Sequence, residues 1–146
     1  MSMKRSAVIG LVAGAGVILA GCGSATPAEV PPAKVTPIAG SQVQRLQLTG
    51  QAIKRLGIVV QPVRAAKVQA GAREVIPYSA VVYDTDGSTW TYANTAARTY
   101  VRQPITVAAI QGNIAVLSAG PPVGTEVVTV GSAELLGTEY DISGEE

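Results

Sequence analysis

The side chains that most often carry out chemistry are scarce in this chain of 146 residues. It contains one cysteine, Cys22, and no histidine. Histidine is the usual general base and a common zinc ligand, so its absence removes the Ser-His-Asp triad and the commonest zinc sites. Ser79 or Ser118 with Lys67 could be imagined as a serine-lysine dyad, but isolated serines in strands are ordinary. We therefore predict no catalytic residues, no metal site, no cofactor and no enzyme activity.

Two further groups of residues admit two interpretations each. Asp84-x-Asp86-Gly87 could be a fragment of a calcium loop, but a third oxygen ligand and a distant Glu are not in register, which favours a hairpin turn. Trp90, Tyr92 and Tyr100, with Tyr83, could form a face that contacts a ligand or a partner. Because the chain has no Phe, the same aromatic residues are also candidates for the large side chains of a core.

The first residues have the layout of a secretory signal. Lys4 and Arg5 precede an uncharged, Gly-containing run, 7–20, which is shorter than the roughly 20 residues that a spanning helix needs. Leu19-Ala20-Gly21-Cys22 resembles the lipobox of bacterial lipoproteins, whose cysteine is diacylated after cleavage just before it. This resemblance implies a signal peptide over 1–21, lipidation of Cys22 with acyl chains such as palmitate, and an extracytoplasmic protein held on the cell membrane by a diacylglyceryl anchor. The alternative is an incidental cysteine in a noncleaved anchor.

The charge balance excludes one class of partner. Removal of residues 1–21 takes away two of the eleven basic residues and leaves nine against ten acidic ones, a net charge of −1. We expect no nucleic-acid partner and no basic field that would attract anionic lipid. About 125 residues allow one domain or two very small ones. With one Trp and no Phe, the core must be mostly aliphatic, and the Val and Thr content favours strands.

The first half of the mature chain divides into two segments. Residues 22–45, rich in Pro, Ala, Ser and Gly, predict the lipidated cysteine followed by a flexible, disordered tether. Residues 46–74 predict a short helix over 47–57, with Thr49 as N-cap and Gly57 as its stop, followed by barrel-like strands over 58–63 and 66–73.

The second half predicts a β domain over 75–138 and a disordered tail over 139–146. Strands are expected at 75–83, 89–93, 99–102, 105–110, 114–118 and 126–130, with a hairpin turn at 84–88 and a helical turn at 132–137 that is capped by Ser132 and stopped by Gly137. The predicted fold is mainly β, a small antiparallel β-barrel or sandwich with one or two short helices.

The order of five segments resembles one known family. Val75-Ile76-Pro77-Tyr78-Ser79-Ala80-Val81 resembles a V-x-P-x-S-A-V strand of periplasmic adaptor subunits, the membrane fusion proteins of tripartite efflux systems. Segments 86–92, 99–107, 112–120 and 123–128 resemble the hairpin and strands that follow it there, and 48–58 is similar, more weakly, to an entry segment of the family's β-barrel. The resemblance covers about residues 46–137 and implies that 75–138 is a membrane-proximal-like domain.

Adaptors of this family also carry a lipoyl-like domain and a long helical hairpin, and the interval from Val60 to Val75 is too short for either. The resemblance therefore implies a noncatalytic, truncated adaptor or accessory subunit of an RND-type or ABC-type efflux transporter. Its partners would be the membrane and a multi-pass permease, with a homo-oligomer as a further candidate state. The alternative is an extracytoplasmic lipoprotein that binds a small molecule or the cell wall.

Overall fold

The computed structural model describes residues 30–68 and 71–141, so Cys22 and its lipobox lie outside the described residues. The fold is mainly β, with antiparallel sheets and two α-helices, as the sequence predicts. In chain order the elements are β1 (Ala33–Pro37), β2 (Gln44–Leu48), α1 (Gly50–Leu56), β3 (Val59–Pro62), β4 (Arg64–Val68), β5 (Gly71–Pro77), the 3-10 turn η1 (Tyr78–Ala80), β6 (Val82–Tyr83), β7 (Thr89–Ala96), β8 (Thr99–Pro104), β9 (Thr106–Gln111), β10 (Ile114–Ala119), β11 (Glu126–Val130) and α2 (Ser132–Asp141).

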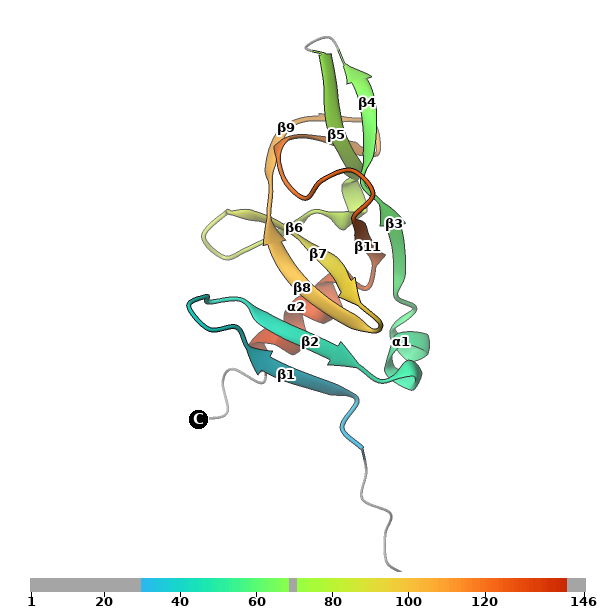
Figure 1. Ribbon diagram of the computed structural model, residues 1–146, viewed down its shortest axis with the longest axis vertical. Coiled ribbons are helices and arrows are strands. Elements are labelled where there is room, and N and C mark those ends of the chain that lie inside the picture. Colours follow the sequence, from blue (N-terminus) through green and yellow to red (C-terminus); the bar gives the residue numbers. More distant parts are fainter. Residues whose placement is uncertain (1–29, 69–70, 142–146) are drawn as a thin grey trace, which may run out of the picture.

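The strands form two sheets. The larger has the order β1-β2-β8-β7-β11-β3, with the short β6 paired to β7, and the smaller has the order β4-β5-β10-β9. In Figure 1 the larger sheet and both helices occupy one end of the long axis, and the β4–β5 hairpin projects at the other end. The chain is therefore elongated, with β1 and α1 far from the hairpin.

At two points the chain passes directly from a strand of one sheet into a strand of the other. A single residue, Val63, separates β3 from β4, and a single residue, Ile105, separates β8 from β9. Both residues are buried and keep backbone hydrogen bonds, Val63 with Thr125 and Gly124, and Ile105 with Thr89. They belong to a hydrophobic cluster between the sheets that also contains Ile76, Ala80, Ala115, Leu117 and Val127.

The main core lies between the larger sheet and the two helices. Its buried members are Leu46, Leu48, Ala52, Val82, Tyr92, Tyr100, Val128 and Leu135. Two tyrosines thus supply the large side chains that Phe provides in most cores, since the chain contains no Phe.

The local signals for α1 are confirmed. The hydroxyl of Thr49 accepts a 3.1 Å hydrogen bond from the Ala52 amide, as an N-cap does. Gly57 ends the helix in the left-handed region, with φ of 65°, and its amide donates to the Ile53 carbonyl. The predicted inner face is also present, because Ala52 is buried and Ile53 and Leu56 pack against the main core.

Four expectations about strands are wrong. Residues 44–48, expected to end the tether and begin the first helix, form β2, and α1 begins only at Gly50. Residues 33–37 were expected in the tether but form β1, which pairs along its whole length with β2 and packs Ala33 and Val35 against the main core. The expected strand 66–73 is instead the end of a hairpin, with Lys67 opposite Ala72 in the β4–β5 register. The apolar run 75–83 is divided by η1, which lets the chain leave the smaller sheet and enter the larger one.

The C-terminal helix is longer than predicted. The helix was expected to end at Gly137, but α2 continues through it. Residues 139–141, expected in a disordered tail, form the last turn of α2. Ser132 is the first helical residue and not a cap, since its hydroxyl donates backwards to the Val128 carbonyl at 3.0 Å. Buried contacts of Glu139, described below, account for the additional turn.

Candidate functional site

The aromatic residues predicted to contact a partner or ligand do not form an open face. Tyr92 and Tyr100 are 0% and 3% exposed and lie in the main core. Trp90 is partly buried, and its indole N–H donates a 2.7 Å hydrogen bond to Ser88 Oγ. Tyr83 is exposed on the short strand β6. The structure therefore assigns Tyr92 and Tyr100 to packing, the second interpretation that the sequence allowed.

The Asp84–Ser88 segment is a hairpin turn between β6 and β7, as predicted. Asp86 Oδ1 accepts hydrogen bonds from the Ser88 amide and hydroxyl at 2.8 and 2.6 Å, and Gly87 has a φ of 82°. These bonds lower the pKa of Asp86, because they stabilise its ionised form. The turn thus uses Oδ1 of Asp86 internally.

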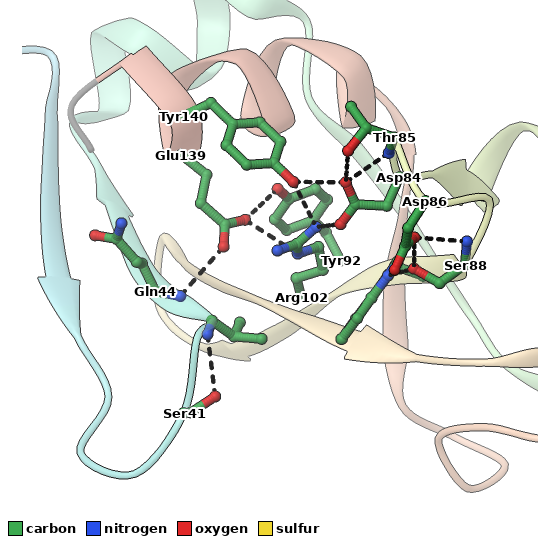
Figure 2. A network of polar contacts seen from close by, with 12 residues as sticks. Ser41, Gln44, Asp84, Thr85, Asp86, Ser88, Tyr92, Arg102, Glu139 and Tyr140 are labelled. Carbon is green, nitrogen blue, oxygen red and sulfur yellow. Dashed lines mark hydrogen bonds and ion pairs between the residues drawn. The ribbon is translucent and has the colours of Figure 1, made fainter. Parts of the chain in front are cut away.

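A buried arginine joins this turn to the C-terminal helix (Figure 2). Arg102 lies on β8 with a side chain only 6% exposed, and its Nη1 is 2.5 Å from Asp84 Oδ2. Its Nε is 3.4 Å from Glu139 Oε2, so both carboxylates flank one guanidinium. The hydroxyl of Tyr140 completes the contact by donating to Asp84 Oδ1 at 2.6 Å. Helix α2 and the β6–β7 turn are therefore held by the same cation.

The rest of the cluster packs around these charges. The Arg102 guanidinium lies 4.6 Å from the centroid of the Trp90 ring and 5.6 Å from that of Tyr140, within the range of cation–π attraction. On its other side, the Tyr92 hydroxyl donates a 2.5 Å hydrogen bond to Glu139 Oε2. Glu139 Oε1 accepts the Gln44 backbone amide at 3.2 Å, which ties α2 to β2 as well.

The electrostatics of the cluster favour the charged forms of its ion pairs. The pKa of Asp84 is lowered, first by the Tyr140 hydrogen bond and then by the Thr85 amide, with Arg102 adding to the effect. Burial alone would lower the pKa of Arg102, but the Tyr140 hydrogen bond and the charge of Glu139 outweigh it and raise that pKa. Burial and the hydrogen bond to Glu139 raise the pKa of Tyr92, so its hydroxyl remains a donor.

This cluster is suited to holding the fold rather than to transferring protons. Both carboxylates that contact Arg102 also accept a hydrogen bond from a tyrosine hydroxyl, Asp84 Oδ1 from Tyr140 and Glu139 Oε2 from Tyr92. Sequence reasoning missed it because its charged members are 18 and 37 residues apart in the chain. One signal was present: Arg102 follows Tyr100 at the spacing that places two side chains on the same face of a strand.

A groove lies at the opposite side of α2, where the described chain begins. It has a volume of about 360 Å³ and a mainly apolar lining that includes Pro31, Pro32, Leu48 and Leu56, with Arg55 and Asp141 at its polar edge. Two neighbouring hollows share Val30 and Thr49, and their linings add Lys34 and Arg98. Val30 is 72% exposed. This end of the molecule therefore combines exposed apolar residues with several basic side chains.

Neither helix in the described part of the chain has the length and apolarity needed to cross a bilayer. Within residues 30–68 and 71–141, no three acidic or cysteine side chains lie together as a metal site would require. Comparisons with protein families, with curated proteins and with solved structures found no match to this chain.

Proposed function

We propose that this protein is a noncatalytic, membrane-anchored lipoprotein that acts as a truncated adaptor or accessory subunit of an RND-type or ABC-type efflux transporter. The anchor part of the proposal rests on Cys22 and the lipobox residues Leu19, Ala20 and Gly21. The adaptor part rests on the ordered resemblance of residues 46–137 to periplasmic adaptor subunits. The mechanism is positional, because a tethered domain has a high local concentration and can use a weak docking contact.

One structural observation carries the proposal furthest. Four of the five segments that resemble the adaptor family pack against one another, because β5 with η1, β9, β10 and β11 all contribute to the cluster around Ile76, Leu117 and Val127. This packing supports a single β unit whose loops and strand edges contact a partner.

The part of the chain between Val60 and Val75 limits the proposed role. It forms the end of β3 and then β4 and part of β5, and these last two strands make a β-hairpin. The proposal is therefore restricted to docking at the membrane, without the conduit that full adaptors build.

A second candidate function uses the groove beside α1. Its volume of about 360 Å³ and apolar lining are in the range of small-ligand sites. These features favour the alternative of an extracytoplasmic small-molecule or cell-wall binding lipoprotein. A thermal-shift screen with cell-wall fragments and apolar ligands would test it. A stabilising ligand whose effect is lost in Pro32→Glu, at the groove lining, would favour this alternative.

The proposed function is tested by crosslinking the lipidated protein in native membranes, purifying it and identifying its partners by mass spectrometry. Cys22→Ala is the control, because it removes the only residue that can carry the anchor. We expect recovery of a multi-pass permease with the wild type and its loss with the control. Recovery of lipidated, folded protein without any transporter component would overturn the adaptor part of the proposal.

A further inference from the structure

The end of the domain that carries β1 and α1 differs from the rest of the surface in three ways. It exposes Val30 next to Pro31 and Pro32, it is hollowed by the apolar groove, and it is ringed by basic side chains. Lys34, Lys54, Arg55 and Arg98 are all exposed there. Apolar residues bordered by Lys and Arg are the surface chemistry of proteins that lie on anionic bilayers.

The basic residues of this end are brought together by the fold. Lys34 and Arg98 line one hollow with Val30, and Arg55 lines the next one with Val30 and Pro32. Arg98 reaches this position because the β7–β8 turn places it in the left-handed region, with φ of 57°, and its carbonyl accepts the Leu48 amide. No ion pair joins these four residues to an acidic side chain within the described residues, although Asp141 lies at the groove edge.

The positions of basic residues do not by themselves indicate which end of the molecule faces the membrane. The β4–β5 hairpin also carries basic residues, Arg64, Lys67 and Arg73, at the other end of the long axis. The short length of chain between Cys22 and the domain favours the β1–α1 end. Cys22 is eight residues before Val30, and fully extended chain spans at most about 3.6 Å per residue, so this end stays within about 29 Å of the lipidated residue.

We propose that the β1–α1 end, with Val30, Lys34, Arg55 and Arg98, binds the anionic phospholipid headgroups of the membrane that holds the anchor, so that the β4–β5 hairpin points away from the bilayer. This inference rests on the lipid anchor of the proposed function and adds an orientation to it. The net charge of −1 conceals this surface, because Asp141 is the only acidic residue, among those described, that lines its three hollows.

The orientation can be measured with a single label in the lipidated full-length protein. Acylation uses the only native cysteine, so an introduced cysteine is the sole free thiol. Gln51→Cys places a fluorophore on exposed α1, and Ala72→Cys places one on the exposed β4–β5 hairpin. Each protein is reconstituted in phosphatidylcholine vesicles with and without phosphatidylglycerol, and quenching by a headgroup-attached nitroxide is recorded.

We expect strong quenching at position 51 and little at position 72 in the anionic vesicles, and loss of the difference at high salt. Two substitutions, Lys34→Gln and Arg55→Gln, neutralise this end. For each charge removed, the ratio of molecules bound through the β1–α1 end to molecules in other orientations should fall by about fivefold. The matched control neutralises Lys67 and Arg64 (Lys67→Gln, Arg64→Gln), which removes the same charges from the hairpin and should leave the quenching unchanged.

Each contrary result has a separate meaning. The proposed orientation is overturned if the two labels on anchored protein are quenched equally, or if the quenching does not depend on phosphatidylglycerol. Either result leaves the anchor intact. The mass of the N-terminal peptide is measured first, and a Cys22 without a diacylglyceryl group overturns the anchor and this inference together.

Discussion

The hydroxyl of Tyr92, on β7, donates a 2.5 Å hydrogen bond to Oε2 of Glu139, on the last turn of α2. The two residues are 47 positions apart in the chain, and both are almost completely buried. A hydrogen bond to a buried carboxylate is among the stronger ones in proteins, because the charge has been withdrawn from water. The attachment of α2 to the sheet therefore depends on this bond.

Tyr92→Phe removes the hydroxyl and keeps the ring. Loss of a donor to a buried carboxylate should lower the free energy of unfolding by about 1–3 kcal/mol. Tyr100→Phe is the matched control, because Tyr100 is equally buried and its hydroxyl makes no hydrogen bond with another described residue. Urea unfolding curves compare the two variants, and equal stability losses would contradict the role given to Glu139.

Replacing the central cation should have a larger effect. Arg102→Met keeps an unbranched apolar stem but leaves Asp84 and Glu139 close together without their shared partner. We expect a loss of about 3 kcal/mol, since breaking a buried ion pair from one side is costly. Arg45→Met, at an exposed position of β2, should change stability by no more than about 0.5 kcal/mol. Chemical denaturation of both variants measures the difference, and a small effect of Arg102→Met would show that the Arg102 ion pairs are not what holds α2.

Asp84 should make the stability of the protein depend on acid pH. Its pKa is lowered in the folded state, chiefly by the Tyr140 hydrogen bond, whereas an unfolded chain has a value near ~3.9. Its contribution is therefore fully present above about pH 5 and is lost as pH falls through the folded-state pKa. Asp84→Asn should be less stable than wild type at neutral pH, and the gap should close as the pH falls. Unfolding curves recorded from pH 7 to about 2 test this, and a gap that stays constant would exclude the charge as its cause.

Gly131 is required for contact between α2 and the segment after α1. A Cβ at this position would overlap Cδ1 of Ile58, and the residue has a φ of 92°. Gly124 also has a φ of 92° but has open space around it. Both Gly→Ala variants should lose about 1 kcal/mol from backbone strain. Gly131→Ala should lose at least about 1 kcal/mol more from overpacking, and part of that excess should disappear when Gly131→Ala is introduced into Ile58→Ala. Thermal unfolding of the single and double variants separates the two effects.

The features that could be predicted from the sequence are those with local causes. Thr49 and Gly57 define the ends of α1 through bonds within four residues, and Asp86, Gly87 and Ser88 form the hairpin turn by themselves. β1 could not be predicted in this way, because its Pro-rich context is typical of a linker and only pairing with β2 makes residues 33–37 a strand.

The Arg102 cluster is the clearest case of a feature with distant causes. Gly137 is a usual helix stop, yet α2 continues through it because Glu139 and Tyr140 bind Arg102, Tyr92 and Asp84 on other elements. No sequence window contains these partners together. The exposed basic end of the domain was hidden for the same reason, since Lys34, Arg55 and Arg98 come from three separate segments.

The passage of β3 into β4 at Val63, and of β8 into β9 at Ile105, has a mechanical consequence. Two strands run through both sheets without a loop, and the residue at each junction is buried and hydrogen-bonded. A load applied at the tip of the β4–β5 hairpin would travel along these continuous strands into the larger sheet, where it would act in shear on many backbone hydrogen bonds at once. We therefore expect the two sheets to move together as one stiff body, with no hinge at Val63 or Ile105.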